Sequence, residues 1–470
     1  MSKKESETLK KESGTLKKAF FYSFGQISDV TAYQAFILLI FTFYFTVVQI
    51  NIWLITLGYA IWTVWNMFND PLIGYLSDRT HTKWGRRMPY IVVFFIPLAV
   101  VMYFLFTPPF PVGTINEIGN FYYFLAIILV FELFYTAFSL NLTSLFPEVF
   151  MTEQERTKAN NVRQIFSIIG LIFAFILPGL IISDFSDPTA LPEYQLFGII
   201  AGIVVIVGAL IFLLFGPKEK QEFREDYKNA FSFFETIKFC FKSKSFRWYI
   251  ISETANWFVF GMLPTLVPLY AKYVLNESDA FMASLLLGLT FISATLFITL
   301  LWRPVVSKIG NRKAWMISMT IWILSLFPLM FIGDLISGLI VFFLIGMGLS
   351  GSLYIIDLVV ADIVDEDEIA TGMRREAGFY GVNAFVLRFS NILVILAIST
   401  VFSTVGWATF DPSVDPSQVA FGLRALIFIF PAIALLIAIL AIYKYPLHGE
   451  KLKEVREKLE EIHEQKKSSV

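Results

Sequence analysis

Long apolar runs alternate with short polar segments along almost all of the 470 residues of the chain. Each run is about 20 residues or longer, the length that a helix needs to cross the hydrocarbon core of a bilayer. The pattern predicts an all-α membrane protein with twelve transmembrane helices, at residues 19–48, 51–77, 89–107, 121–147, 163–183, 196–216, 247–271, 281–303, 313–333, 336–361, 378–404 and 420–443.

Lys and Arg gather in every second connection, as the positive-inside rule expects of cytoplasmic loops. The connections 108–120, 184–195 and 405–419 contain neither residue type, although Lys272 and Arg424 fall on that outer side. Both termini are therefore predicted to be cytoplasmic. The predicted domains are a tail at 1–18, a six-helix bundle at 19–216, a cytoplasmic connector at 217–246, a second six-helix bundle at 247–443 and a solvated surface helix at 444–470.

Composition narrows the class further. Hydrophobic residues make up 56% of the chain and charged residues 16%, which excludes an ordinary soluble protein and favours a multi-pass protein of the cell membrane. The single Cys240 rules out an intramolecular disulfide, and the three histidines, His81, His448 and His463, all fall in polar segments. We therefore expect no metal site and no cofactor. The expected partners are a small-molecule solute and the lipid bilayer, without nucleic acid; the oligomeric state is open and compatible with a monomer.

A weak repeat links the two halves. GYLSDRTHTKWGRR follows the second predicted span and RPVVSKIGNRKAW follows the eighth, so a Gly and a basic pair stand at the same place in each half. Two parallel six-helix repeats around a central cavity resemble the architecture of the major facilitator superfamily. The charged turn at these helix ends is predicted to brace a cytoplasmic gate, the alternative being simple positive-inside anchoring. The gate set is Asp78, Arg79, Gly85, Arg86, Arg87, Asp362 and Asp365.

Four ordered motifs carry a closer resemblance. They are NDPLIGYLSDRTHTKWGRRMPY, FPEVFMTEQERTKANNVRQ, ADIVDEDEIATGMRREAGFYGVNAF and GLRALIFIFP. The chain resembles the glycoside-pentoside-hexuronide:cation symporters, a family that includes the melibiose carrier and animal lysolipid carriers. The resemblance implies that Asn66, Asp70, Thr136 and Arg388 stand where sugar-transporting members hold their coupling cation, Na⁺ or H⁺. One acid of that pattern is therefore an amide here, and its lysine is an arginine.

The sugar-binding acids of the family fall on Ile27 and Ser139, neither of which can replace a carboxylate. A polar cavity is still predicted, because ionisable groups within apolar runs usually face a cavity or a partner. The alternative for each member is an interhelical hydrogen bond that only packs the bundle. Glu132 is expected to pair with Arg163 or with another basic group. The candidate solute-binding residues are Gln26, Asp29, Tyr135, Ser139, Asn141, Arg163, Glu253, Asn256, Trp257, Asp357 and Asn383.

Three functions compete at this point. The first is a secondary transporter of a small solute, a sugar or glycoside, working by alternating access with Na⁺ or H⁺ symport. The second is a carrier of lysolipids or other amphipathic solutes with the same fold, or an uncoupled facilitator. The third is a membrane enzyme, because DEDE at 365–368 resembles half of an Asp-rich metal site. Such a site needs two acid clusters, and DEDE is more simply expected to pair with Arg374 and Arg375, so we do not expect an enzyme.

Asp70 needs a specific explanation, because a carboxylate deep in a membrane helix costs free energy unless it has a partner or a function. We expect it to pair with Arg388, since a guanidinium stays charged and favours the ionised acid. With Asn66 in place of the second acid, that pair would be neutral and would attract a cation weakly. Loose or absent coupling is the resulting expectation. The competing outcome is a working cation site formed by Asp70, Asn66 and Thr136.

Overall fold

A computed structural model describes residues 3–80, 82–150, 152–218, 233–371 and 375–468. Within these ranges almost every segment is helical and no strand is present, so the all-α prediction is confirmed there. A helix satisfies all of its backbone hydrogen bonds internally, which is what an apolar segment in lipid requires. His81 and Arg374 lie outside the described residues, as do residues 219–232 of the predicted connector.

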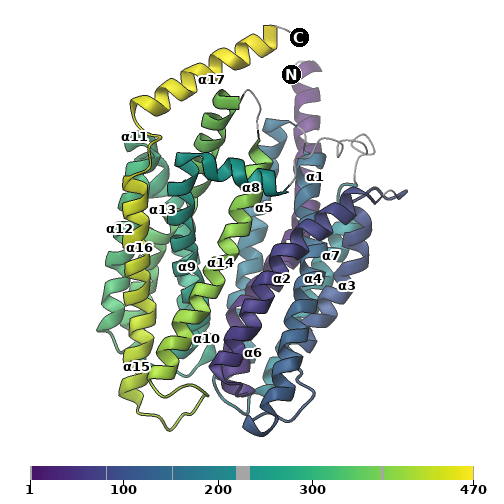
Figure 1. Cartoon of the computed structure of the whole chain (residues 1–470). Coiled ribbons are helices and arrows are strands. Elements are labelled where there is room, and N and C mark those ends of the chain that lie inside the picture. Colours follow the sequence, from purple (N-terminus) through teal and green to yellow (C-terminus); the bar gives the residue numbers. More distant parts are fainter. Residues whose placement is uncertain (1–2, 81, 151, 219–232, 372–374, 469–470) are drawn as a thin grey trace. The chain divides into compact units, whose positions relative to one another are not determined.

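The chain divides into two compact units (Figure 1). The first comprises Met1–Asn229 with the segments Ser278–Gly288 and Ala408–Pro412. Its main elements are α1 (Lys3–Thr42), η1 (Phe43–Val47), α2 (Ile52–Asp78), α3 (Met88–Phe104), η2 (Thr114–Asn116), α4 (Glu117–Val149), α5 (Glu153–Phe175), α6 (Leu177–Ile181) and α7 (Leu191–Phe215).

The second unit comprises Ala230–Glu277, Leu289–Trp407 and Ser413–Val470. Helix α10 (Ala280–Phe297) begins among residues of the first unit and ends in the second. The other elements are α8 (Phe233–Lys242), α9 (Lys244–Tyr273), η5 (Ile298–Trp302), α11 (Arg303–Ile309), α12 (Asn311–Leu326), η6 (Phe327–Met330), α13 (Leu335–Thr371), α14 (Glu376–Thr404), α15 (Pro416–Arg424), η7 (Ala425–Ile429), α16 (Phe430–Tyr443) and α17 (Glu450–Ser468).

Ten helical stretches of the described chain are long and apolar enough to cross a membrane. The remaining two predicted spans correspond to α2, with 27 residues, and to the shorter apolar α3, with 17 residues. The total of twelve spans thus stays a prediction. Some predicted spans are interrupted: Pro178 follows the end of α5 and begins the short α6, and five-residue π-helical turns form η1, η5 and η7.

Helix α1 is the core element of the first unit. It packs against α5 and α7, and 78% of its most apolar window is buried. Helix α4 packs against α2, α3 and α1. It carries residues of two polar groups in this unit, one around Asp29 and one around Asp70. These neighbours can be followed as the purple to blue helices of Figure 1.

In the second unit, α9 packs against α14 and α16, and α12 packs along α13. The α12–α13 contact depends on glycine, because a Cβ atom at Gly348 would lie 2.4 Å from the Trp322 Cα. Close helix approach at small residues is the usual way that membrane helices associate.

Both polar ends of the chain are helical, and the N-terminal end is more helical than its sequence suggested. Helix α1 begins at Lys3, so the predicted tail at 1–18 continues directly into the first span. The C-terminal helix predicted at 444–470 overlaps α17, which begins at Glu450.

Candidate functional site

A buried carboxylate in α1 brings several predicted solute-binding residues together. Asp29 is 7% exposed, and its Oδ2 accepts a hydrogen bond of 3.0 Å from Gln26 Nε2. Tyr135 and Ser139 of α4 lie next to the same carboxylate, and the Arg163 guanidinium of α5 adds a favourable charge interaction. The other oxygen, Asp29 Oδ1, has no hydrogen-bond partner among the described residues. Asp29 is therefore a buried acceptor next to one amide and two hydroxyl groups.

An aromatic column runs beside this carboxylate. The Tyr135 ring stacks on Tyr33 with a centroid distance of 4.8 Å, and the Phe131 ring lies nearly parallel to Tyr135 with a centroid distance of 5.8 Å. Phe131 in turn stacks on Phe36 at 4.4 Å. Stacked aromatic faces fix the position of Tyr135, and they also provide the kind of surface on which the apolar face of a sugar ring packs.

A second polar group connects α2 to α4. Thr136 Oγ1 donates a hydrogen bond of 3.0 Å to Asp70 Oδ1, so two of the four predicted cation residues are in contact. Thr136 Oγ1 also lies 3.4 Å from Glu132 Oε1, one turn earlier on α4. Glu132 is fully buried, and its Oε2 accepts a hydrogen bond of 3.0 Å from Trp62 Nε1. We call Asn66, Asp70, Glu132 and Thr136 the α2–α4 cluster.

Asn66 is the third predicted cation residue in this region. Its side chain is fully buried, and neither its Oδ1 nor its Nδ2 has a hydrogen-bond partner among the described residues. An unsatisfied buried polar group costs about 1–3 kcal/mol, so such an amide needs an explanation. Arg388, the fourth predicted residue, lies on α14 in the second unit and is half-buried.

The second unit holds its own buried carboxylate. Glu253 on α9 is 2% exposed, and its Oε1 accepts hydrogen bonds from Asn383 Nδ2 at 3.0 Å and Trp257 Nε1 at 3.4 Å. Its Oε2 has no partner among the described residues. Asp29 and Glu253 are thus alike: each lies on the first long helix of its unit and accepts a hydrogen bond from an amide side chain.

Other predicted solute-binding residues make packing contacts instead. Asn141 Nδ2 donates to the Ala137 carbonyl of its own helix at 2.8 Å, and Asn256 Nδ2 donates to the Ser252 carbonyl at 2.8 Å. These contacts fit the packing alternative. Asp357 lies on α13 in the second unit, and its side chain is exposed.

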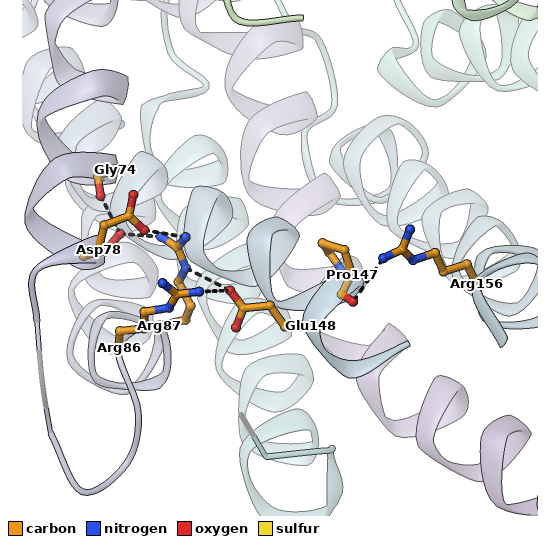
Figure 2. Close-up of polar contacts among 8 residues, drawn as sticks. Gly74, Asp78, Arg86, Arg87, Pro147, Glu148 and Arg156 are labelled. Atoms are coloured by element: carbon orange, nitrogen blue, oxygen red, sulfur yellow. Dashed lines mark hydrogen bonds and ion pairs between the residues drawn. The ribbon is translucent and has the colours of Figure 1, made fainter. Parts of the chain in front are cut away.

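The predicted gate residues of the first unit form a charged cluster (Figure 2). Arg87 bridges to Asp78 at 2.6 Å and donates to Ser77 Oγ at 2.7 Å. Arg86 bridges to Glu148 at the end of α4 at 2.8 Å, and Arg87 Nε lies 3.7 Å from the same carboxylate oxygen. Two arginines of the α2–α3 loop thereby tie α2 to α4.

Gly85 allows this loop to turn, because its φ of 103° is one that L side chains rarely adopt. The turn is closed by paired backbone hydrogen bonds between Thr82 and Gly85. Arg79 points elsewhere: its guanidinium lies over the Tyr75 ring at 4.0 Å.

The corresponding loop of the second unit holds different partners. Arg312 donates to the carbonyls of Ile442 and Tyr443 at the C-terminal end of α16, which a basic side chain stabilises. Asn311 Nδ2 donates to Asp362 Oδ2 at 2.7 Å. Asp362 is 5% exposed, and Asp365 lies one turn further along α13.

Helix α17 reaches back to the same region. Arg456 bridges to Asp362 Oδ1 at 3.0 Å, and Lys451 bridges to Glu366 at 2.7 Å. In addition, Arg375 bridges to Asp367 at 2.5 Å and lies over the Phe239 ring of α8. Pairing of the acidic run with Arg375 was expected; its pairing with the C-terminal helix was not.

Sequence reasoning missed the contacts that two acidic residues of α4 make. Glu148 lies within the quoted motif FPEVFMTEQERTKANNVRQ, and a lone acid at the end of an apolar run facing a basic loop was the available signal. Glu132 was expected to pair with Arg163 or with another basic group, and its contacts with Trp62 and Thr136 were not foreseen. Its spacing of four residues from Thr136 was the clue that both share one face of α4.

Comparison with known proteins extends these observations. A family model described as MFS/sugar transport protein matches residues 21–449. The sodium-dependent lysophosphatidylcholine symporter 1 of Mus musculus is 25% identical over 444 residues, which cover 86% of this chain and 80% of that protein. The isoprimeverose transporter of Lactiplantibacillus pentosus is 24% identical over 383 residues, covering 79% and 76% of the two chains.

A solved structure resembles the chain in fold. The nucleoside transporter NupG superposes with a TM-score of 0.66 at 15% identity, covering 92% of this chain and all of that one. At this level of identity the likeness concerns the fold and not the solute.

Proposed function

The chain belongs to the family of MFS/sugar transport proteins, and from this we propose that it carries a sugar or glycoside across the membrane by alternating access. The family resemblance drawn from the four motifs is thereby confirmed. It is a multi-pass membrane transporter, and membership of a transporter family favours transport over the enzyme alternative.

One observation carries the choice of solute: each unit has a buried carboxylate surrounded by neutral hydrogen-bonding side chains, at Asp29 and at Glu253. A carboxylate oxygen accepts hydrogen bonds from hydroxyl groups, and it does so more strongly than a neutral acceptor. The Tyr135 ring beside Asp29 supplies the aromatic face. Within the first unit, a polyhydroxylated solute matches the Asp29 carboxylate and the Tyr135 ring better than an apolar solute does.

We propose Na⁺ as the coupling ion. The contact between Asp70 and Thr136 supports a cation site in the first unit, because both supply oxygen atoms. One relative is named for sodium dependence and another for a sugar, which fits the symport of a sugar with Na⁺. Proton coupling and uncoupled transport are the alternatives that the measurements below separate.

The proposed topology has twelve spans in two six-helix bundles, with both termini in the cytoplasm. The basic loop cluster then lies at the cytoplasmic ends of α2 and α4, where Asp78, Arg86, Arg87 and Glu148 act as a gate. Alternating access in this fold moves one bundle against the other around a fixed site, so contacts at helix ends must form and break.

The test is uptake into proteoliposomes, screened across monosaccharides, disaccharides and aryl glycosides with and without a Na⁺ gradient. Asp29→Asn and Glu253→Gln are each expected to raise the KM for the transported sugar about tenfold or more, since a hydrogen bond to a charged acceptor contributes about 1.5–3 kcal/mol. Asp415→Asn, on an exposed turn, is the control. Absence of uptake for every sugar, together with transport of a lysolipid, would contradict the proposal.

A second candidate function is transport of a lysolipid, which one observation favours. The second unit contains an apolar groove of about 810 Å³ between α9, α14 and α16, lined by residues such as Ala255, Ala397 and Ala434. A groove of this kind fits an acyl chain. Ala434→Trp is expected to impair transport of lysophosphatidylcholine and to leave sugar transport unchanged, so the two functions predict opposite sensitivities to one substitution.

A further inference from the structure

The apolar groove of the second unit is open to the bilayer. It has a volume of about 810 Å³ and lies between α9, α14 and α16, and Phe241 of α8 adds to its lining. Several lining side chains, among them Ile251, Leu393 and Ile437, are exposed. These three helices belong to stretches long and apolar enough to cross a membrane, so their exposed apolar side chains meet lipid acyl chains.

The two hydroxyl groups in the lining of this groove are already satisfied. Thr254 Oγ1 donates to the Ile250 carbonyl at 2.7 Å, and Thr400 Oγ1 donates to the Leu396 carbonyl at 2.8 Å. Each proton is therefore used within the side chain's own helix. Burying the hydroxyls of a sugar here without partners would cost free energy, whereas an acyl chain needs none. The groove therefore fits an acyl chain better than a polyhydroxylated solute.

Basic side chains gather where α8 ends and α9 begins. Lys242 ends α8, Lys244 begins α9 and Arg247 lies one turn further, and all three side chains are exposed. Within the described chain, none of the three forms an ion pair with an acid. Helix α8 packs against both α9 and α14, so this basic segment borders the groove (Figure 1).

Helical periodicity places Arg247 on the groove side of α9. Residues 247, 251, 254 and 258 are separated by four, three and four positions, so their side chains share one face. Ile251, Thr254 and Phe258 all line the groove. Glu253 lies on another face of α9, where it hydrogen-bonds to α14. Because long basic side chains extend along apolar surface and keep their charge at the headgroup level, Arg247 adds a cation to one end of the groove.

We propose that this groove binds an anionic phospholipid, with an acyl chain along α9, α14 and α16 and the phosphate held by Lys242, Lys244 and Arg247. Basic pockets between membrane helices bind anionic headgroups, and a guanidinium pairs well with phosphate oxygens. The N-terminal end of α9 adds a helix dipole that favours an anion. A choline headgroup fits less well, because its own cation is repelled by three basic side chains.

The lipid is bound and not carried, so the inference goes beyond the proposed function and is independent of the transported solute. In the proposed topology the basic end of α9 is cytoplasmic, and the lipid therefore comes from the inner leaflet. Such a lipid would join α8, α9, α14 and α16 at their shared surface and stabilise the folded second unit.

The experiment follows the unfolding temperature of the full-length protein, purified in a non-ionic detergent, as dioleoylphosphatidylglycerol or dioleoylphosphatidylcholine is added. The two lipids have the same acyl chains and differ in headgroup charge. A ligand that binds the folded state raises the unfolding temperature. The headgroup variant combines Lys242→Gln, Lys244→Gln and Arg247→Gln. Its matched control removes three other exposed basic residues of the same unit, by Arg303→Gln, Lys308→Gln and Lys313→Gln.

A second pair of variants tests the acyl chain. Ala255→Trp fills the groove, because Ala255 belongs to its lining. Leu324→Trp is the control, since Leu324 is an exposed residue of α12 outside the groove. The substitutions of the headgroup variant are all at exposed positions, so that variant keeps the proposal testable even if Ala255→Trp does not fold.

Phosphatidylglycerol is expected to stabilise wild type and both controls at concentrations at least about tenfold lower than phosphatidylcholine, because each nearby Lys or Arg attracts an anionic lipid. The headgroup variant is expected to lose this preference, and Ala255→Trp the response to both lipids. In wild type the preference should shrink as the NaCl concentration rises, because salt screens exposed charges.

Equal responses of wild type to the two lipids would overturn the proposal. So would a headgroup variant that keeps the preference, a charge control that loses it, or a folded Ala255→Trp that still responds to phosphatidylglycerol. Lysophosphatidylcholine is added in a parallel titration. If it stabilises wild type at lower concentrations than phosphatidylglycerol, and Ala255→Trp abolishes that effect, the groove belongs to the second candidate function instead. Failure of every sugar in the uptake screen would contradict the proposed solute and not this lipid site.

Discussion

Replacing Glu148 by Gln is expected to destabilise the first unit more than any other neutralisation in the Arg86–Arg87 loop cluster. The Glu148 side chain is 12% exposed, and its partners Arg86 and Arg87 are 9% and 11% exposed. Removing one partner of a buried ion pair costs about 3–5 kcal/mol, because the remaining charge is left without compensation. A Gln keeps one acceptor oxygen, so we take the lower end, about 3 kcal/mol.

Asp78 gives the comparison, because its side chain is 39% exposed although its bridge to Arg87 is only 2.6 Å long. Exposed ion pairs contribute about 0–1 kcal/mol. For a body of about 150–250 residues, each kcal/mol shifts the unfolding temperature by about 2–4 °C. Glu148→Gln is therefore expected to lower the unfolding temperature by about 6–12 °C, and Asp78→Asn by at most about 4 °C.

The assay is thermal unfolding of the detergent-purified variants, followed by the loss of the monodisperse peak in size-exclusion chromatography. A double-mutant cycle with Arg86→Gln isolates the pairwise interaction energy, which is expected to be stabilising and larger in magnitude than that between Arg87 and Asp78. Glu155→Gln, in the exposed first turn of α5, serves as the control. If Asp78→Asn lowers the unfolding temperature as much as Glu148→Gln does, burial does not rank these pairs and the reasoning fails.

Three further predictions concern the second unit. Cys240 is fully buried, and burial raises the pKa of its thiol to about 12, so N-ethylmaleimide is expected to label it at neutral pH only after denaturation; labelling of the native protein would contradict this. Arg456→Ala is expected to leave Asp362 more exposed and to speed tryptic cleavage of α17, whereas an unchanged cleavage rate would show that the bridge does not hold the helix. His448 accepts from Arg312 at 2.7 Å as a neutral ring, and burial together with Arg312 lowers its pKa. Its contribution to stability is therefore present above about pH 6.5 and lost as the pH falls toward the folded-state value, and a pH dependence of the unfolding temperature that survives His448→Gln would have another origin.

Much of the helical architecture could be predicted because lipid permits few alternatives. A run of about 20 apolar residues has to be a helix, so the positions of the long helices followed from hydropathy. The interruptions did not follow as readily. Pro178 marks one of them, but the π-helical turns, such as η7 within the last predicted span, have no comparable signal in the sequence.

In the candidate site too, the sequence could predict some residues and not others. Asp29 could be singled out from sequence because an acid in an apolar run stands out, and Tyr135 because the family resemblance marked it. The hydrogen bond that Glu132 accepts comes from Trp62, which lies 70 residues earlier on another helix. Packing between helices decides such partners, and no local pattern encodes it.

Helix α4 has a consequence for how the transporter moves. It carries Tyr135 and Ser139 beside Asp29, Glu132 and Thr136 in the α2–α4 cluster, and Glu148 in the loop cluster. From Glu132 to Glu148 the helix rises about 24 Å at 1.5 Å per residue. A rod of that length, tilted by about 5° around its Glu148 end, displaces Glu132 by about 2 Å, which is enough to break a hydrogen bond. In the proposed mechanism, tilting of α4 therefore couples solute binding, cation binding and gating, because one rigid helix carries residues of all three proposed sites.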